Sequence, residues 1–539
     1  MAAPARACAD VAPALAPTAP DHALKRRTRT ALPTPPHGHG AEVELKLALP
    51  GADPLRIAAQ VAAVPWLAGL PVAEQKLRNI YYDTPAQDVR RHRAALRLRS
   101  VRQGTGGTRW LQTFKTSGQS AAGLSQRGEW EATVRHGRLD PIALQGTPWH
   151  VLDADGTLLP QLAPCFETES TRTLRVYTAG DGSRIEVVLD VGGVRAGQAR
   201  SALCELELEL LEGPPDALFA LADHIATHLP VLPAPISKAE RGWRLVDGTL
   251  QQPRRARPLG LDEDMPVLIA AQAVLGEMLG QFVENLGGIV ESDGAELVHQ
   301  ARVGWRRWRS ALWLFKPLLA AGPHPVPDTA PLRPLLNALG AMRNLDVAAL
   351  ESLPPWADAW IAGDTGRAQA WQALEAAVAA ERRIHRAGLL AVLQSPATGR
   401  ALLALERWLH ALPRAALPAD VAGRVIGDWA AARTQRLHAR LAAEAEEMNA
   451  ADPATPEGLE HQHEVRLLAK RTRYVLESLR PVLPGKRTRR WQKQATELQT
   501  RIGAARDLML LATLLEPLGV HPGLLGFLRG VAAARAVDD

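Results

Sequence analysis

Cysteine is scarce in this chain, and its scarcity excludes two classes of protein. The 539 residues contain three cysteines, Cys8, Cys165 and Cys204. They are too few for a disulfide framework and lack the paired spacing of a zinc site. We therefore expect a protein of a reducing compartment, located in the cytoplasm.

Long hydrophobic runs are also missing. No run approaches the roughly 18 consecutive apolar residues that a membrane helix needs. The N-terminus has no basic segment followed by an unbroken apolar core, so we expect neither a signal peptide nor a membrane partner. Aromatic residues make up only 4% of the chain, but hydrophobic residues as a whole reach 46%, which is enough for real cores.

Neither sign of charge is in strong excess. The formal net charge is +6 and the pI is about 9.4. A polyanion partner is therefore expected only where basic residues cluster. The length corresponds to roughly three or four domain-sized units.

Composition divides the chain into units of different character. The predicted units are a disordered tail at 1–40, a strand-rich unit at 41–248, a linker at 249–261 and a helical unit at 262–539, divided at about 262–420 and 421–539. His37 and His39 are better explained by a flexible tail than by a metal site. Within the strand-rich unit, helices are expected over 54–68 and 214–229.

Charged residues alternate with apolar ones along several predicted strands of the 41–248 unit. Glu42, Glu44 and Lys46 occupy alternate positions, so on a β-strand their side chains share one face. Residues 96–99 and 205–209 follow the same rule. Strands with all-acidic and all-basic faces in one domain indicate a shared polar interior, as in a small barrel that encloses a ligand. Strands with solvated faces and surface salt bridges are the alternative.

The charges of this unit form two sets. The acidic candidates are Glu42, Glu44, Glu129, Glu131, Glu186, Asp190, Glu205 and Glu207. The basic candidates are Lys46, Arg97, Arg99, Lys115, Arg172 and Lys238. Burying either set alone would cost several kcal/mol per unpaired ion. Lys and Arg bind phosphate oxygens, and carboxylates without clustered cysteine or histidine favour Mg²⁺ or Mn²⁺. The pattern therefore predicts a polyphosphate bound with divalent metal.

The helical unit contains an internal repeat. Residues 299–309 (HQARVGWRRWR) recur without a gap at 463–473 (HEVRLLAKRTR), and residues 340–346 (GAMRNLD) recur downstream at 503–509 (GAARDLM). Two matches in the same order are poorly explained by chance, so we expect two related helical bundles packed as a pair.

The repeated segment predicts a basic helix face, because its cations fall at i, i+4 and i+7 with a histidine one turn earlier. The residues of this face are His299, Arg302, Arg306 and Arg309 in the first copy and His463, Arg466, Lys470 and Arg473 in the second. Like charges stacked on one face repel, so two copies in register favour an anionic partner over a solvated face. DNA and RNA are disfavoured because no base-stacking aromatic set is present. Each histidine lies among cations and is interpreted as a phosphate or core hydrogen-bond partner rather than a metal ligand.

A family resemblance rests on several motifs in one order. The motif Glu42-x-Glu44-x-Lys46 is followed by 82–85 (YDTP), 96–99 (LRLR), 113–115 (TFK) and 205–207 (ELE). With these motifs, the strand-rich unit resembles the CYTH domain of the triphosphate tunnel metalloenzymes. The resemblance implies a closed antiparallel barrel that binds triphosphate compounds with divalent metal and hydrolyses or cyclises them. The helical unit resembles a CHAD domain, a histidine-containing helical module often fused to CYTH, and polyphosphate is the partner this implies.

The resemblance also assigns roles by motif position. It implies the metal ligands Glu42, Glu44, Asp190, Glu205 and Glu207. It implies the phosphate-binding residues Lys46, Arg97, Arg99, Lys115, Arg172 and Lys238. Glu42, Glu44 and Lys46 form the expected catalytic set. Three points stay open: whether Arg172 or Arg175 faces the tunnel, what Glu129 and Glu131 do, and whether Glu209 replaces Glu205.

The sequence thus predicts an α+β protein that acts as a metal-dependent inorganic triphosphatase, yielding pyrophosphate and phosphate. One of two Mg²⁺ or Mn²⁺ ions would hold the substrate, and the second would activate water. A non-catalytic polyphosphate-binding or sensing protein, an ATP cyclase and a thiamine triphosphatase are the alternatives. No sequence feature specifies adenine.

Overall fold

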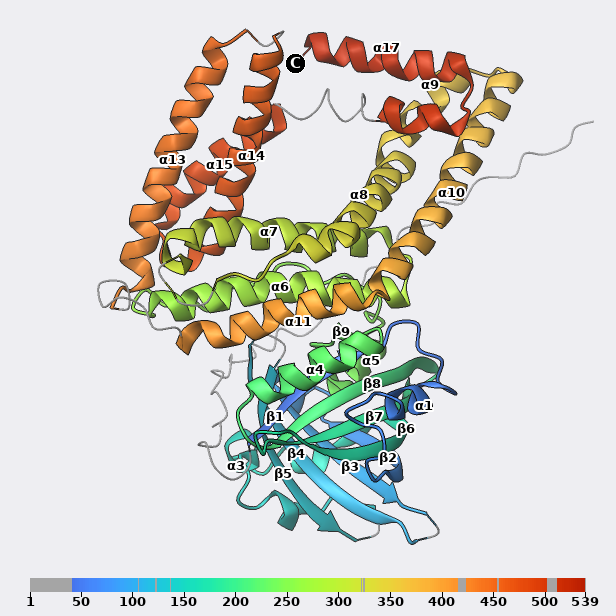
Figure 1. The fold of residues 1–539 in the computed structure, drawn as a ribbon, viewed down its shortest axis with the longest axis vertical. Helices are drawn as coiled ribbons and strands as arrows, with labels where there is room; N and C mark the ends of the chain where they lie inside the picture. Colours follow the sequence, from blue (N-terminus) through green and yellow to red (C-terminus); the bar gives the residue numbers. More distant parts are fainter. Residues whose placement is uncertain are drawn as a thin grey trace, which may run out of the picture.

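A computed structural model of the chain describes residues 41–104, 106–121, 124–135, 137–320, 322, 325–414, 423–452, 455–501 and 511–538. Antiparallel strands occupy the first part of the chain and helices the second (Figure 1). The expected α+β class is confirmed. The tail expected at 1–40 lies outside the described residues.

Within the described residues the strands form one antiparallel sheet. Its members are β1 (Ala41–Ala48), β2 (Ala73–Asp83), β3 (Ala94–Arg102), β4 (Arg109–Ala121), β5 (Leu124–Val134), β6 (Ala163–Thr178), β7 (Arg184–Ala196), β8 (Ala199–Glu212) and β9 (Leu232–Pro233). The strand order is β5-β4-β3-β2-β6-β7-β8-β1-β9, and β1 pairs with β5 as well as with β8. The strand β1, near one end of this order, is therefore also hydrogen-bonded to β5 at the other end.

Short helices accompany the sheet: α1 (Ile57–Ala62), α2 (Asp88–Arg91), α3 (Trp149–Leu152), α4 (Asp216–His228) and α5 (Lys238–Val246). Because leucines alternate with charged residues, each strand turns its leucines to one side. Leu45, Leu47 and Leu206 are fully buried there with apolar residues of α1 and α4, each contributing about 1.5–3 kcal/mol. The helices expected over 54–68 and 214–229 are present, the first over fewer residues. The charged side chains consequently face the other side.

The second half of the chain is helical. Its α-helices within the described residues are α6 (Val267–Glu291), α7 (Ala295–Leu319), α8 (Arg333–Val347), the short α9 (Ala357–Ile361), α10 (Thr365–Leu393), α11 (Pro396–Ala411), α13 (Ile426–Ala450), α14 (Pro456–Ser478), α15 (Gly485–Arg501) and α17 (Pro522–Asp538). In Figure 1, α6, α7 and α11 lie nearest the sheet, α13, α14 and α15 rise on one side, and α8 and α10 rise on the other.

Each copy of the sequence repeat occupies the second helix of a helical hairpin. Residues 299–309 lie in α7, which follows α6, and residues 463–473 lie in α14, which follows α13. The two helices α7 and α14 are in contact, and Arg307 lies 3.6 Å from the Glu477 carboxylate across them. The second downstream copy, 503–509, lies outside the described residues.

Helix α6 corrects the expectation that no segment of the chain is apolar enough for a membrane helix. By length and composition alone, α6 is long and apolar enough to cross a membrane. The same holds for the bent pair of α10 and α11 together with the turn that follows. More than half of the α6 window, 56%, is buried inside the protein. Its apolar residues, such as Phe282 and Met278, belong to the core shared with α7 and α11. The apolar composition of α6 is therefore explained by burial in the helical core.

The helical half contacts the sheet unit through α11, which lies on α4 (Figure 1). Arg400 donates two hydrogen bonds to Asp223 at 2.8 and 3.1 Å, and Arg407 pairs with Asp216 at 2.6 Å. These pairs are about half exposed and contribute little energy each. They do fix the orientation of α11 on α4.

A close approach of α6 and α7 at Gly304 yields a test of the packing. A Cβ built on Gly304 would lie 2.8 Å from the backbone nitrogen of Phe282. Because this nitrogen belongs to the backbone of α6, the contact could be relieved only by shifting α6 relative to α7. Gly304→Ala is expected to lower the free energy of unfolding by about 1–3 kcal/mol, measured by denaturant unfolding. Gly287→Ala is the control, because nothing lies near its Cβ, and it should be neutral or stabilising by up to about 1 kcal/mol. Equal effects of the two variants would contradict the packing described.

Candidate functional site

Side chains from every strand from β1 to β8 line one cavity of about 1380 Å³, and all of these strands except β2 contribute charged ones. The predicted tunnel residues on its wall are Glu42, Glu44, Lys46, Arg97, Arg99, Lys115, Arg172, Glu207 and Lys238. Asp190 and Glu205 contact Lys238 but are not part of the wall. The structure thus brings the predicted residues into one interior, as the alternation along the strands implied.

At one end of this interior, Lys238 sits among three carboxylates. Its Nζ lies 2.8 Å from Asp190 and 2.9 Å from Glu207, and it also pairs with Glu205. Arg172 donates to Asp190 at 2.9 and 2.6 Å. Burial alone would raise the pKa of Asp190, but Lys238 and Arg172 bring it well below its ordinary value. Every charge in this buried cluster therefore has a partner of opposite sign.

Lys46 pairs with two carboxylates of the cavity wall. Its Nζ lies 2.9 Å from Glu44 and pairs with Glu207. Burial would lower the pKa of Lys46, yet Glu207 and Glu44 hold it above its ordinary value. The lysine of the Glu-x-Glu-x-Lys motif thus connects the acidic residues of β1 and β8, which are adjacent strands.

A second group of ion pairs surrounds Lys115. Its Nζ lies 2.8 Å from Glu42 and 2.6 Å from Glu129, and Arg97 approaches Glu129 at 3.4 Å. Although burial raises the pKa of Glu129, Lys115 and Arg97 lower it to about 2. Glu131 accepts a hydrogen bond from Thr113 at 3.0 Å. Both carboxylates whose role was open, Glu129 and Glu131, therefore line the cavity as partners of neighbouring side chains.

Arg99 lies on the cavity wall near two other arginines, Arg97 and Arg172, which already pair with Glu129 and Asp190. Burial, followed by the nearby charges of Arg97 and Arg172, lowers the pKa of Arg99 to about 10. Its Nε donates to the Asn79 side chain at 2.8 Å, a neutral acceptor. Arg175, by contrast, is not on the wall, and its Nε and Nη1 have no hydrogen-bond partner among the described residues. Arg172 is thus the residue that faces the cavity, and the arginine cluster favours an anion.

The opposite imbalance occurs around Glu209. Burial, together with the carboxylates of Glu42, Glu186 and Glu129, raises the pKa of Glu209 to about 7. Glu209 lies on β8 directly opposite Glu44 on one neighbouring strand and Glu186 on the other. It lines the cavity, whereas Glu205 does not. The period-2 pattern of residues 205–209 carried this signal, but the sequence did not show which end of the pattern reached the cavity.

The donors in this acidic region fit a hard divalent cation. Among the described residues, the cavity wall carries carboxylates but no cysteine or histidine, which is the ligand set of Mg²⁺ or Mn²⁺. Glu42, Glu44, Glu186 and Glu209 are the residues that could hold such an ion. Asp190, Glu205 and Glu207 also offer oxygens within 4.8 Å of one another, although Lys238 already pairs with all three.

In the helical half, the first copy of the basic face gathers around Arg343. Burial lowers the pKa of His299, and the Arg343 guanidinium lowers it further. Burial and the charges of Arg306 and Arg343 likewise lower the pKa of Arg302. Arg306 has a buried Nε without a hydrogen-bond partner among the described residues. Arg343 belongs to the 340–346 segment, so the downstream repeat supplies a cation that the predicted set omitted.

The remaining residues of the predicted basic faces lie farther along α7 and α14. Arg309 is near Arg471 and contributes to lowering the pKa of Arg471, after burial. Arg466 and Arg473 each have a buried Nε without a hydrogen-bond partner among the described residues. On the same helix α14, His463 precedes Arg466 in the sequence, and Lys470 lies between Arg466 and Arg473. Cations of both copies therefore meet where α7 contacts α14.

Two family models match these two halves of the chain. A CYTH domain model matches residues 40–243, and a CHAD domain model matches residues 273–516. The chain carries a CYTH domain followed by a CHAD domain. A curated inorganic triphosphatase of Haemophilus influenzae is 28% identical over 209 residues, 38% of this chain and 54% of that protein. The chain thus spans about half the length of this curated relative.

Solved structures resemble each half separately. The CHAD domain from the plant Ricinus communis is 27% identical and aligns over 53% of this chain and 91% of that chain, with a TM-score of 0.43. A Hippeastrum protein, described as an adenylyl cyclase candidate with a dominant triphosphatase activity, is 18% identical. It aligns over 38% of this chain and 95% of that chain, with a TM-score of 0.28.

The CYTH cavity continues to the boundary with the CHAD domain. Glu406 of α11 lines it and is 4% exposed. Its Oε2 has no hydrogen-bond partner among the described residues, and burial raises the pKa of Glu406 to about 8. Helix α5 connects the two domains here: Lys238 begins it, and Arg244 near its end pairs with Glu284 of α6.

The pKa of Glu406 predicts a pH dependence of stability. Between the ordinary pKa of 4.5 and about 8, the folded protein keeps a proton that the unfolded chain has lost. The contribution of Glu406 to the free energy of unfolding therefore falls as pH rises through this window. Glu406→Gln stays neutral, so its melting temperature should match that of the native protein near pH 4.5 and exceed it near pH 9.

The measurement is thermal unfolding across this pH range. Glu263→Gln, at an exposed position, is the matched control and should leave the difference from the native protein independent of pH. Parallel curves of melting temperature against pH for Glu406→Gln and the native protein would show that Glu406 is ionised in the folded state.

Proposed function

We propose that the CYTH domain is a metal-dependent hydrolase that cleaves inorganic triphosphate to pyrophosphate and phosphate, with Mg²⁺ or Mn²⁺ as cofactor. The observation that carries the proposal is the pairing of an acidic wall with an arginine cluster in one cavity. A triphosphate with its cations complements both at once. The β1–β5 pairing supports a further point of the proposal, that the sheet closes into a tunnel around the substrate.

Each group of side chains has one task in this proposal. Arg97, Arg99 and Arg172 bind phosphate oxygens, replacing their mutual repulsion by attraction to the anion. Glu42, Glu44 and Glu209 hold the cations. A bound divalent ion supplies a Lewis acid and lowers the pKa of its water, and we propose two such ions. Positioning and charge neutralisation dominate the catalysis of phosphoryl transfer.

The lysines keep the site assembled before substrate binds. Lys46 and Lys238 hold carboxylates that would otherwise repel one another in a buried interior. Lys115 does the same for Glu42 and Glu129. With a divalent cation bound to these carboxylates, the lysine ammonium groups would be available to phosphate oxygens. The predicted dual role of Lys46, in catalysis and in substrate binding, has this physical basis.

Inorganic triphosphate is preferred over nucleotide substrates for a reason of shape and charge. The cavity wall is dominated by charged side chains. Such a wall favours the binding of an anion with its cations over the binding of a flat aromatic base. The name of the Haemophilus influenzae relative supports the same substrate. ATP cyclisation, hydrolysis of thiamine triphosphate and non-catalytic binding are the outcomes that a substrate panel separates.

For the CHAD domain we propose binding of polyphosphate by the basic faces of α7 and α14. Cations that are half-buried and lower one another's pKa, as around Arg302 and His299, are stabilised by an anion. The Nε atoms of Arg306, Arg466 and Arg473 have no hydrogen-bond partner in the described part of the chain and offer donors to it. A chain of phosphates would contact both copies of the repeat where α7 and α14 meet.

The metal role of β1 predicts the result of one substitution. Glu44→Gln removes a ligand charge while keeping the side-chain shape, and it should lower kcat for triphosphate hydrolysis by about 100-fold or more. Phosphate release is the measurement, at limiting and saturating Mg²⁺. Glu74→Gln, exposed on β2, is the control and should be unchanged. Native turnover by Glu44→Gln at limiting Mg²⁺ would refute the metal role.

The arginine cluster predicts a different kinetic effect. Arg97→Ala or Lys115→Ala removes charge that binds the phosphates before and during the reaction, so KM should rise more than kcat falls. Steady-state kinetics with triphosphate, ATP and thiamine triphosphate measure both constants for each substrate. A preference for ATP with cyclic product would reject the triphosphatase in favour of a cyclase. Absence of turnover with every substrate and either metal would leave a binding protein.

The CHAD proposal predicts a salt-dependent loss of binding. Arg306→Ala should weaken binding of long-chain polyphosphate and flatten the plot of log affinity against log salt concentration by about one unit per lost contact. Arg333→Ala removes the same charge at an exposed position of α8 and serves as the control. Identical affinities and slopes for both variants would contradict a binding role for the α7 face.

A further inference from the structure

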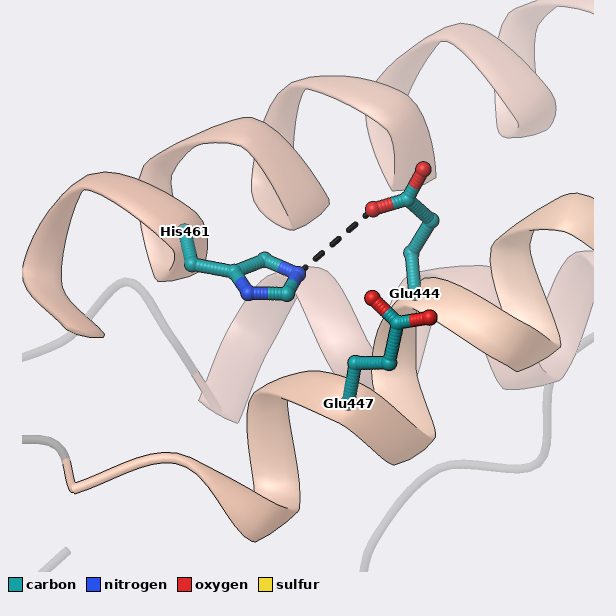
Figure 2. A group of neighbouring side chains, drawn as sticks. All are labelled: Glu444, Glu447 and His461. Atoms are coloured by element: carbon teal, nitrogen blue, oxygen red, sulfur yellow. Dashed lines mark ion pairs between the residues drawn. The ribbon is translucent and has the colours of Figure 1, made fainter. Parts of the chain in front are cut away.

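A group of side chains outside both sites has the composition of a metal site. Glu444 and Glu447 lie one turn apart on α13, and His461 lies on the neighbouring helix α14. Figure 2 shows the two carboxylates directed toward the imidazole. One ligand atom from each residue lies within 4.8 Å of the others. None of the three belongs to the tunnel or to the predicted basic faces.

The imidazole nitrogen that faces the carboxylates lacks a partner suited to it. His461 Nε2 is buried and has no hydrogen-bond partner among the described residues. It lies 3.5 Å from Glu444 Oε2, and the two groups form an ion pair only when the imidazole is protonated. A tetrahedral ion with bonds of about 2.1 Å separates its ligands by about 3.4 Å. The observed separation therefore matches two ligands of one ion.

Glu444 is also oriented in the manner of a ligand. Its other carboxylate oxygen, Oε1, accepts a hydrogen bond from Arg440 Nε at 3.3 Å. Arg440 lies one turn earlier on the same helix, so it holds one oxygen and leaves Oε2 directed at His461. Hydrogen bonds to the outer atoms of ligating side chains are the usual means by which proteins position them.

We propose that Glu444, Glu447 and His461 bind a divalent transition-metal ion of the Zn²⁺ class, with water completing its coordination. The imidazole distinguishes this site from the cavity of the sheet, because nitrogen ligands favour Zn²⁺ over Mg²⁺, whereas the described residues of the cavity wall offer carboxylate oxygens and no imidazole. The ion joins α13 to α14 close to the connection between them. Two residues beyond His461, α14 begins the basic face with His463, so the ion stabilises the hairpin that carries this face.

The test is Zn²⁺ and Co²⁺ binding to the full chain, in millimolar Mg²⁺ to occupy the oxygen sites of the tunnel. Titration calorimetry counts Zn²⁺ ions, and the visible spectrum of Co²⁺ reports a nitrogen ligand. The native protein should bind one more ion than His461→Ala or Glu447→Gln does. Saturating Zn²⁺ should raise the melting temperature of the native protein but not that of either variant.

Two control variants make the result decisive. Glu446→Gln removes an exposed charge beside Glu447, and His521→Ala removes an exposed imidazole elsewhere. Both should keep the extra ion and the rise in melting temperature. Circular dichroism should show that Glu447→Gln is folded. Glu447 is exposed, so the loss of its charge should leave the helix intact. Equal ion counts in the native protein and His461→Ala, or equal losses in Glu447→Gln and Glu446→Gln, would overturn the site. Neither result depends on triphosphatase activity.

Discussion

The mutual neutralisation of buried charges is the constraint on which the CYTH half depends. Leucines alternate with charged residues along β1 and β8, so covering the leucines with α1 and α4 forces the charges inward. An unpaired ion in that interior would cost several kcal/mol. The charged interior is stable because Lys46, Lys238 and Arg172 form ion pairs with Glu44, Glu207 and Asp190.

The same balance explains how one cavity serves two kinds of ligand. Where acids outnumber bases, around Glu209, burial and the neighbouring carboxylates raise the pKa of Glu209 to about 7, and a divalent cation would relieve this repulsion. Where bases outnumber acids, around Arg99, a phosphate would compensate. The ligand that satisfies both regions is an anion carrying its own cations. Helix α5 places Lys238 in this balance and reaches α6 through Arg244, so the CHAD domain is linked physically to the cavity.

Much of the site followed from residue spacing, and the shortfalls have identifiable causes. The period of two along 42–46 and 205–209 correctly placed these charges on interior faces, since strand geometry is local. It did not show that Glu209 reaches the wall and Glu205 does not, because Glu205 is buried against Lys238 of α5, a contact between segments far apart in the sequence. The pairing of β1 with β5 joins segments some eighty residues apart, which no local pattern encodes. Arg343 was missed because its own segment is uncharged apart from Asp346, and only the packing of α8 on α7 brings it to His299.

The most direct test of the account is a crystal structure of the protein with Mn²⁺ and a non-hydrolysable triphosphate, recorded where manganese scatters anomalously. We expect manganese peaks within about 2.0–2.3 Å of carboxylate oxygens of Glu42, Glu44 or Glu209, and phosphate oxygens bonded to Arg97 and Arg99. Manganese and triphosphate found only on the outer surface of the sheet, with the interior ion pairs unchanged, would contradict it.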